Sequence, residues 1–163
     1  MGWREAFIKQ SRSDFDIMRK LEGDRMPYAH RLHYLQMATE KLGKGWMTKA
    51  NAKEHPPASH QAFVRMLQVM KGQPHVRRQL GYNNRDHFSA YINSLLDFAL
   101  AVQNLAPAVA GFTRQNPEYP WRETTNSDVI APVDFDFPNF MSAGTRKMPD
   151  LVKLVDSLLR IAE

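Results

Sequence analysis

The spacing of large side chains between positions 28 and 46 constrains the fold of this chain more than any other feature. At alternating steps of four and three residues the chain carries Tyr28, Leu32, Leu35, Thr39, Leu42 and Trp46. Steps of three and four place side chains on one face of an α-helix, and their alternation is typical of a helix that packs along other helices. The pattern therefore predicts a helix over about 27–46 inside a helical bundle.

Similar spacing elsewhere in the chain predicts the remaining helices. The segments that carry it lie at about 3–21, 60–70, 84–102 and 149–161. Ser59 and either Asn83 or Asn84 are suited to cap the second and third of these segments, and Pro149 suits the first turn of the last. One further short helix is expected over about 75–80. The predicted fold class is therefore mostly α, as an antiparallel bundle of four to five helices.

A long segment without helical spacing precedes the last helix. Its residues, about 113–145, are here named the flap, and its four prolines interrupt any helix. Within the flap, VDFDF at 133–137 alternates apolar and acidic residues like a half-buried strand, and Tyr119–Trp121 is placed to pair with it across TTNS. We therefore expect an irregular flap with a candidate small β-hairpin, anchored over one end of the bundle by its aromatic side chains. Loops of this length are often functional.

Length and composition bound the class of protein. The 163 residues fit one domain, 1–163, which buries roughly 70% of the surface of the unfolded chain. The absence of cysteine excludes disulfides, thiolate metal sites and cysteine nucleophiles. Because the N-terminus also lacks the apolar run of a secretory signal, we expect a cytoplasmic protein. The longest apolar segment, 95–112, is interrupted by Asp97 and Pro107 and falls short of a membrane span, so no membrane association is expected.

Basic residues are concentrated in the first half of the chain. Positions 1–90 hold 16 Lys and Arg against 8 Asp and Glu, whereas positions 91–163 hold 6 against 9. Such a basic half favours a polyanionic partner, since the field over a surface follows its summed charge. The residues predicted to contact RNA or a nucleotide are Arg65, Lys71, Arg77, Arg78 and Arg85. An exposed Tyr82 ring among them would suit base stacking, and the alternative is a solvated connector with Tyr82 packed into the core.

Motifs of several common enzyme classes are missing from the chain. It contains no Gly-x-Ser-x-Gly, no glycine-rich phosphate loop, no Glu-x-x-His and no His-Glu-x-x-His. A second face of the 27–46 helix, about 160° from the apolar stripe, carries His30, His33, Met37, Glu40 and Lys44. Histidines three residues apart on one helix are typical of a solvent-exposed face unless a facing helix adds ligands. We therefore expect no metal ion and no cofactor, and we assign no catalytic residue.

The first two predicted helices resemble those of the HEPN superfamily. The residues that carry the resemblance are Asp14, Asp16 and Met18 in the first helix and QMATEKLGK, 36–44, in the second. The match covers about residues 3–48. It implies an antiparallel bundle of four or five helices, frequent dimerisation, and work around RNA or nucleotides, either as an RNase toxin or as the companion of a nucleotidyltransferase.

The catalytic motif of active HEPN members is not found where that resemblance would place it. Those members carry Arg, four to six residues and then His near a late helix, so that the imidazole moves a proton while Arg steadies the phosphate. Here residues 146–163 contain no histidine. The only pair with this spacing is Arg25 and His30, at the start of the second helix.

These observations lead to one main functional prediction and two alternatives. The main prediction is a HEPN-like binding or accessory domain for RNA or a nucleotide, without the usual nuclease motif. As partners we expect a second copy, in a homodimer, and a nucleotidyltransferase. The first alternative is a protein-interaction module of the dimer or toxin–antitoxin type that uses the flap. The second is an RNase or another enzyme with a non-standard site, such as a pocket beneath Tyr119–Trp121.

Overall fold

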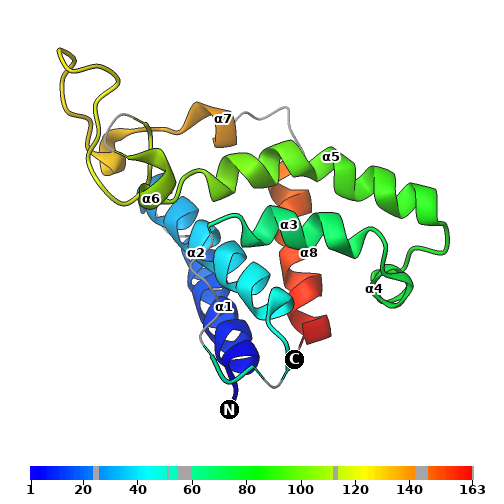
Figure 1. Ribbon diagram of the computed structural model, residues 1–163. Coiled ribbons are helices and arrows are strands. Elements are labelled where there is room, and N and C mark those ends of the chain that lie inside the picture. The colour runs from blue at the N-terminus through cyan, green and yellow to red at the C-terminus, as the bar shows by residue number, and fades with distance from the viewer. Residues whose placement is uncertain (24–25, 51, 55–59, 112–113, 142–146, 163) are drawn as a thin grey trace.

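The computed structural model describes residues 1–163 except 24–25, 51, 55–59, 112–113, 142–146 and 163, and it is mostly helical (Figure 1). The helices are α1 (Trp3–Lys20), α2 (Tyr28–Met47), α3 (Ala62–Met70), α4 (Pro74–Gln79), α5 (Arg85–Gln103), α6 (Pro107–Ala110), the 3-10 helix η1 (Pro132–Asp134), α7 (Pro138–Met141) and α8 (Lys147–Ala162). The predicted fold class is confirmed as mostly α.

The predicted number of helices, four to five, is too low for the part of the chain that the structure describes. The short helix expected over about 75–80 is α4, which begins at Pro74, and the two unpredicted short α-helices also begin at a proline: α6 at Pro107 and α7 at Pro138. Proline fits the first helical position, because its fixed φ suits the helix and its missing N–H would have no partner there. A proline that interrupts one pattern therefore starts a short helix of its own.

The apolar stripe of α2 faces inward, as its spacing predicts. Leu32, Leu35, Thr39 and Leu42 are buried, and α1 packs along α2 (Figure 1). The two helices are also joined by a buried hydrogen bond of 2.6 Å, which the Ser11 hydroxyl donates to the backbone carbonyl of Ala38. The α1–α2 pair therefore forms one wall of the core.

The other walls come from α3, α5 and α8. Figure 1 shows α3 beside α5, with α8 packed against α1 and α5. The side chain of Asn84 caps α5 as expected, because its Oδ1 accepts hydrogen bonds from the backbone N–H groups of Asp86 and His87 at 2.7 and 3.0 Å. The predicted cap of α3, Ser59, lies outside the described residues. Across the described ranges, none of the helices has both the length and the apolarity that a membrane crossing requires.

The predicted β-hairpin of the flap is wrong. Trp121 pairs with Ile130 through two backbone hydrogen bonds of 3.1 and 2.8 Å, and this isolated bridge is the strand-like pairing found in the described part of the flap. Residues 132–134 form η1 in place of a strand, because Pro132 starts a helical turn and has no N–H for a ladder.

The aromatic residues of the flap anchor it, with one exception. Trp121 and Phe137 are buried, Phe135 is half-buried, and their rings lie 5.0 to 5.9 Å apart between centroids. Tyr119, in contrast, is 52% exposed. The flap is also tied to α2, because the Tyr28 hydroxyl donates a hydrogen bond of 3.2 Å to the backbone carbonyl of Phe140. Trp121, Phe135 and Phe137 therefore join the flap to the core of the helices, whereas Tyr119 does not.

Candidate anion-binding pocket

Three of the five basic residues predicted from the sequence line one pocket. Lys71 directly follows α3, Arg77 lies in α4, and Arg85 opens α5. The connection Gly72, Gln73 and Pro74 completes the lining of a cavity of about 210 Å³. The structure therefore brings cationic groups from three separate segments to one place.

Buried apolar contacts hold these segments together. Val76 of α4 is fully buried, and Leu80 and Tyr82 pack against the same core. Gly81 adopts a φ of 81°, in the left-handed region that favours glycine, and so lets the chain turn after α4. The backbone N–H of Tyr82 then donates to the carbonyl of Arg77 at 3.0 Å. These contacts fix α4 beside the start of α5.

The cationic groups of the pocket have no carboxylate partners. None of the residues that line it is acidic, and none of its three cations forms an ion pair with a described residue. Lys71 Nζ donates a hydrogen bond of 2.9 Å to Asn93 Oδ1. Arg77 Nε is buried and has no hydrogen-bond partner in the structure. A buried donor without an acceptor costs about 1–3 kcal/mol, and a bound anion would supply the missing acceptor.

A larger charged pocket lies between α1, the start of α2 and α8, and its charges are largely paired. It has a volume of about 530 Å³. Glu22 lies 2.7 Å from Arg31 and 3.3 Å from Arg19, between carboxylate oxygen and guanidinium nitrogen, and Asp156 lies 2.6 Å from Arg160 in the same way. An anion entering there would have to displace these carboxylates. Arg31 Nε is also buried there without a hydrogen-bond partner, so it is the absence of carboxylates that makes the smaller pocket at Arg77 the better candidate for an anion.

The other two predicted residues, Arg65 and Arg78, stay outside the pocket. Both are exposed, on α3 and α4 respectively. Tyr82 is half-buried and stacks on Tyr91, with ring centroids 5.3 Å apart and an interplanar angle of 23°. Burial, with smaller contributions from Tyr82 and Asp150, raises the pKa of Tyr91 to about 12. Tyr82 is therefore packed against Tyr91 and the core, as the packed alternative predicts, and part of its side chain stays exposed.

No protein-family model, curated protein or solved structure matches this chain. The HEPN resemblance therefore stays a prediction from the residues that carry it.

Those residues join α1 to α2. Asp14 is buried, and its carboxylate accepts hydrogen bonds from Lys41 Nζ of α2 at 2.5 Å and from Gln10 Nε2 at 3.1 Å. A buried carboxylate needs such partners, since desolvation penalises an unpaired charge. Two residues of the HEPN-like pattern, Asp14 and Lys41, therefore have a structural role in this chain.

The sequence predicts that the polar face of α2 is exposed to solvent, but in the structure the residues of this face are half-buried. Glu40 accepts hydrogen bonds from Lys44 Nζ at 2.6 Å and Gln36 Nε2 at 2.9 Å, and His60 Nδ1 lies 3.4 Å away. Burial alone would raise the pKa of Glu40, but the hydrogen bonds and the charge of Lys44 lower it below its usual value. His33 Nδ1 lies 3.7 Å from Glu118 Oε2 of the flap. His60 and Glu118 therefore cover part of this face.

Metal binding finds no support in the geometry of the described ranges. No group of three or more His, Asp or Glu side chains there is placed to hold a metal ion. Arg25 of the Arg25–His30 pair lies outside those ranges.

Proposed function

We propose that this protein is an RNA-associated binding domain that holds a backbone phosphate between Lys71, Arg77 and Arg85. The observation that carries the proposal is the convergence of three cations on a pocket without a carboxylate, with Arg77 Nε lacking an acceptor. Guanidinium groups suit this task, because their planar N–H donors pair with two phosphate oxygens at once.

The size of the pocket favours RNA over a free nucleotide. Pockets for complete small molecules usually have volumes of about 300–1,000 Å³, whereas this one has about 210 Å³. It fits one anionic group better than a base, sugar and phosphate together. The exposed Arg65 and Arg78 would add long-range attraction for the rest of a polyanion.

The proposed role is binding and not RNA cleavage. Residues 146–163 contain no histidine that could transfer a proton, and the buried residues of α8 pack into the core. In the HEPN-like version of the proposal, the chain acts as an accessory domain beside a nucleotidyltransferase.

Replacing both pocket arginines is expected to weaken RNA binding at least tenfold. The variant is Arg77→Gln combined with Arg85→Gln, because hydrogen bonds to charged groups contribute about 1.5–3 kcal/mol each. The slope of log affinity against log salt concentration should become shallower by about 0.7, because the pocket holds one phosphate and each neutralised phosphate of a single strand contributes about 0.7 to the slope. Fluorescence anisotropy with a labelled single-stranded RNA, titrated at several salt concentrations, measures both quantities.

The matched control is Arg65→Gln combined with Arg78→Gln, which also removes two positive charges, both from exposed residues outside the pocket. It is expected to weaken binding by no more than about threefold, as an exposed charge contributes little beyond steering. A wild-type protein without salt-dependent RNA binding would overturn the proposal. So would equal losses for the pocket variant and this two-charge control.

A second candidate function, self-association through the flap, is favoured by one observation. Three apolar flap side chains are exposed by about half: Tyr119 by 52%, Val129 by 56% and Val133 by 48%. Exposed apolar side chains that gather on one segment favour a protein contact over bulk solvent. A homodimer through the flap would cover them.

For this second candidate, changing Tyr119, Val129 and Val133 to aspartate is expected to convert a dimer into a monomer. Light scattering after size exclusion measures the mass, and far-ultraviolet circular dichroism checks that the helices persist. Leu100→Asp is the control, because Leu100 of α5 is 43% exposed but lies outside the flap. Point changes are preferable to deletion of the flap, since Trp121 and Phe137 belong to the core. A wild-type monomer, or a dimer that survives the triple change, would rule this candidate out.

A further inference from the structure

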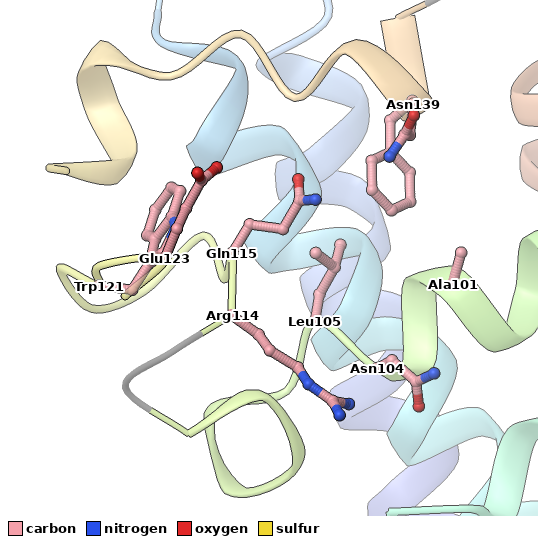
Figure 2. Close-up of a pocket in the computed structure, with 9 residues that line it drawn as sticks. Ala101, Asn104, Leu105, Arg114, Gln115, Trp121, Glu123 and Asn139 are labelled. Carbon is pink, nitrogen blue, oxygen red and sulfur yellow. The ribbon is translucent and has the colours of Figure 1, made fainter. Parts of the chain in front are cut away.

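A second pocket lies at the other end of α5, beneath the flap (Figure 2). Its volume is about 410 Å³, within the range usual for small-molecule sites. The lining comes from the end of α5, from Asn104 and Leu105 just after it, and from the flap, α7 included. Apolar walls are formed by Leu105 and Phe140, and polar groups by Asn104, Arg114, Gln115, Glu123 and Asn139.

One polar atom at this pocket lacks the partner that its burial demands. Gln115 Oε1 is buried, and no hydrogen-bond donor reaches it in the structure. A buried amide oxygen without a donor costs free energy, as it has lost its water and gained nothing. An N–H group of a bound molecule would satisfy it.

Two opposite charges line the same pocket without meeting. Arg114 and Glu123 are both exposed, and neither forms an ion pair with the other or with a third described residue. In Figure 2 the guanidinium of Arg114 points toward Asn104, whereas the carboxylate of Glu123 lies beside the ring of Trp121, away from that guanidinium. The lining of the pocket therefore offers a cation, an anion that is not paired with it, and a buried hydrogen-bond acceptor.

We propose that this pocket binds a small zwitterion of the amino-acid or dipeptide kind. Its carboxylate pairs with Arg114, its ammonium group pairs with Glu123, and an N–H donates to Gln115 Oε1. The opposite charges of the lining cancel, so the pocket has no general preference for anions, in contrast to the pocket at Arg77. The walls of Leu105 and Phe140 suit a short aliphatic side chain.

This site is independent of the proposed RNA contact. The two pockets lie toward opposite ends of α5, a helix of 19 residues that is about 28 Å long at 1.5 Å per residue. Loss of RNA binding would therefore leave the zwitterion proposal standing, and the reverse also holds.

Isothermal titration calorimetry with three probes tests the proposal. The probes are alanine, alanyl-alanine, and alanyl-alanine acetylated at its N-terminus and amidated at its C-terminus. Alanine or alanyl-alanine is expected to bind at micromolar to millimolar concentration, and the capped peptide to bind at least tenfold more weakly, because it has neither charge. Tighter binding of alanine identifies an amino-acid site, and tighter binding of alanyl-alanine identifies a dipeptide site.

Single variants of the charged residues separate the pocket from the rest of the surface. Arg114→Gln and Glu123→Gln are each expected to weaken binding of the preferred zwitterion at least tenfold, since each removes a charge-assisted hydrogen bond. Gln115→Leu should weaken it as well. Arg122→Gln is the matched control, because Arg122 is an exposed flap residue outside the lining and should leave affinity unchanged.

Exchanging the two charges gives the sharpest test. Arg114→Glu combined with Glu123→Arg keeps both charges in the pocket, so a zwitterion can bind in the reverse direction. This double variant should therefore bind the zwitterion more tightly than Arg114→Glu alone or Glu123→Arg alone. Circular dichroism confirms that each variant is folded. The proposal is overturned if neither zwitterion binds at millimolar concentration, if the capped peptide binds equally well, or if Arg122→Gln weakens binding as much as Arg114→Gln.

Discussion

Replacing Gly43 by alanine is expected to destabilise the protein by about 2–4 kcal/mol, although alanine is the better helix former by about 1 kcal/mol. Gly43 is buried in α2 where the start of α3 passes. A Cβ atom there would lie 2.5 Å from the backbone nitrogen of Phe63 and 2.6 Å from the carbonyl carbon of Ala62. Backbone atoms cannot move aside as a side chain can. The two helices would have to separate and loosen the core around them.

Gly45→Ala is the matched control in the same helix. Its added Cβ would lie 2.6 Å from Ile8 Cδ1, the far end of a flexible side chain that can change rotamer. The cost of moving Ile8 and the gain in helix propensity should offset each other to within about 1 kcal/mol. Urea unfolding followed by far-ultraviolet circular dichroism measures both variants. Equal losses for Gly43→Ala and Gly45→Ala would contradict the close approach of α2 and α3.

The long helices could be predicted from the sequence because burial of an apolar face determines them. The stripe of α2 turns inward over its length, and the side chain of Asn84 caps α5. Both are local patterns whose physical cause lies within a few turns of helix. The close approach of the α3 backbone to Gly43 could not be predicted, since it depends on which segment of the chain passes that point of α2.

The flap shows where local patterns fail. VDFDF has the alternation of a strand, but Pro132 opens η1, and the ring of Phe137 is drawn into a cluster with Trp121. A short alternating pattern carries little free energy, so a buried aromatic cluster decides the backbone instead.

The candidate sites, too, could be predicted only in part from the sequence. The sequence indicates the basic residues, but the burial of Val76 and the turn at Gly81 determine that Lys71, Arg77 and Arg85 meet while Arg65 and Arg78 do not. The pocket lined by Arg114 and Glu123 has no sequence pattern, because its lining comes from the end of α5, the two residues Asn104 and Leu105, and scattered positions of the flap.

Phe137→Ala is expected to lower the free energy of unfolding by about 3–5 kcal/mol. Phe137 is fully buried, with its ring centroid 5.0 Å from that of Phe135 and 5.9 Å from that of Trp121. It also has a φ of 48°, in the left-handed region, which costs a side-chain-bearing residue about 1–2 kcal/mol. In the native protein the buried ring offsets that strain. Alanine keeps the strain and loses most of the burial.

Glycine at the same position separates the two contributions. Phe137→Gly loses the ring as well, but glycine adopts a positive φ without strain, so this variant should be more stable than Phe137→Ala by about 1 kcal/mol. At Phe135, half-buried and with an ordinary φ of −112°, the order should reverse and alanine should be the more stable. Urea unfolding of the four variants measures the order, and trypsin cleavage after Arg122 reports whether the flap has loosened. If the alanine variant is more stable than the glycine variant at both positions, the ring of Phe137 holds no strained backbone in place.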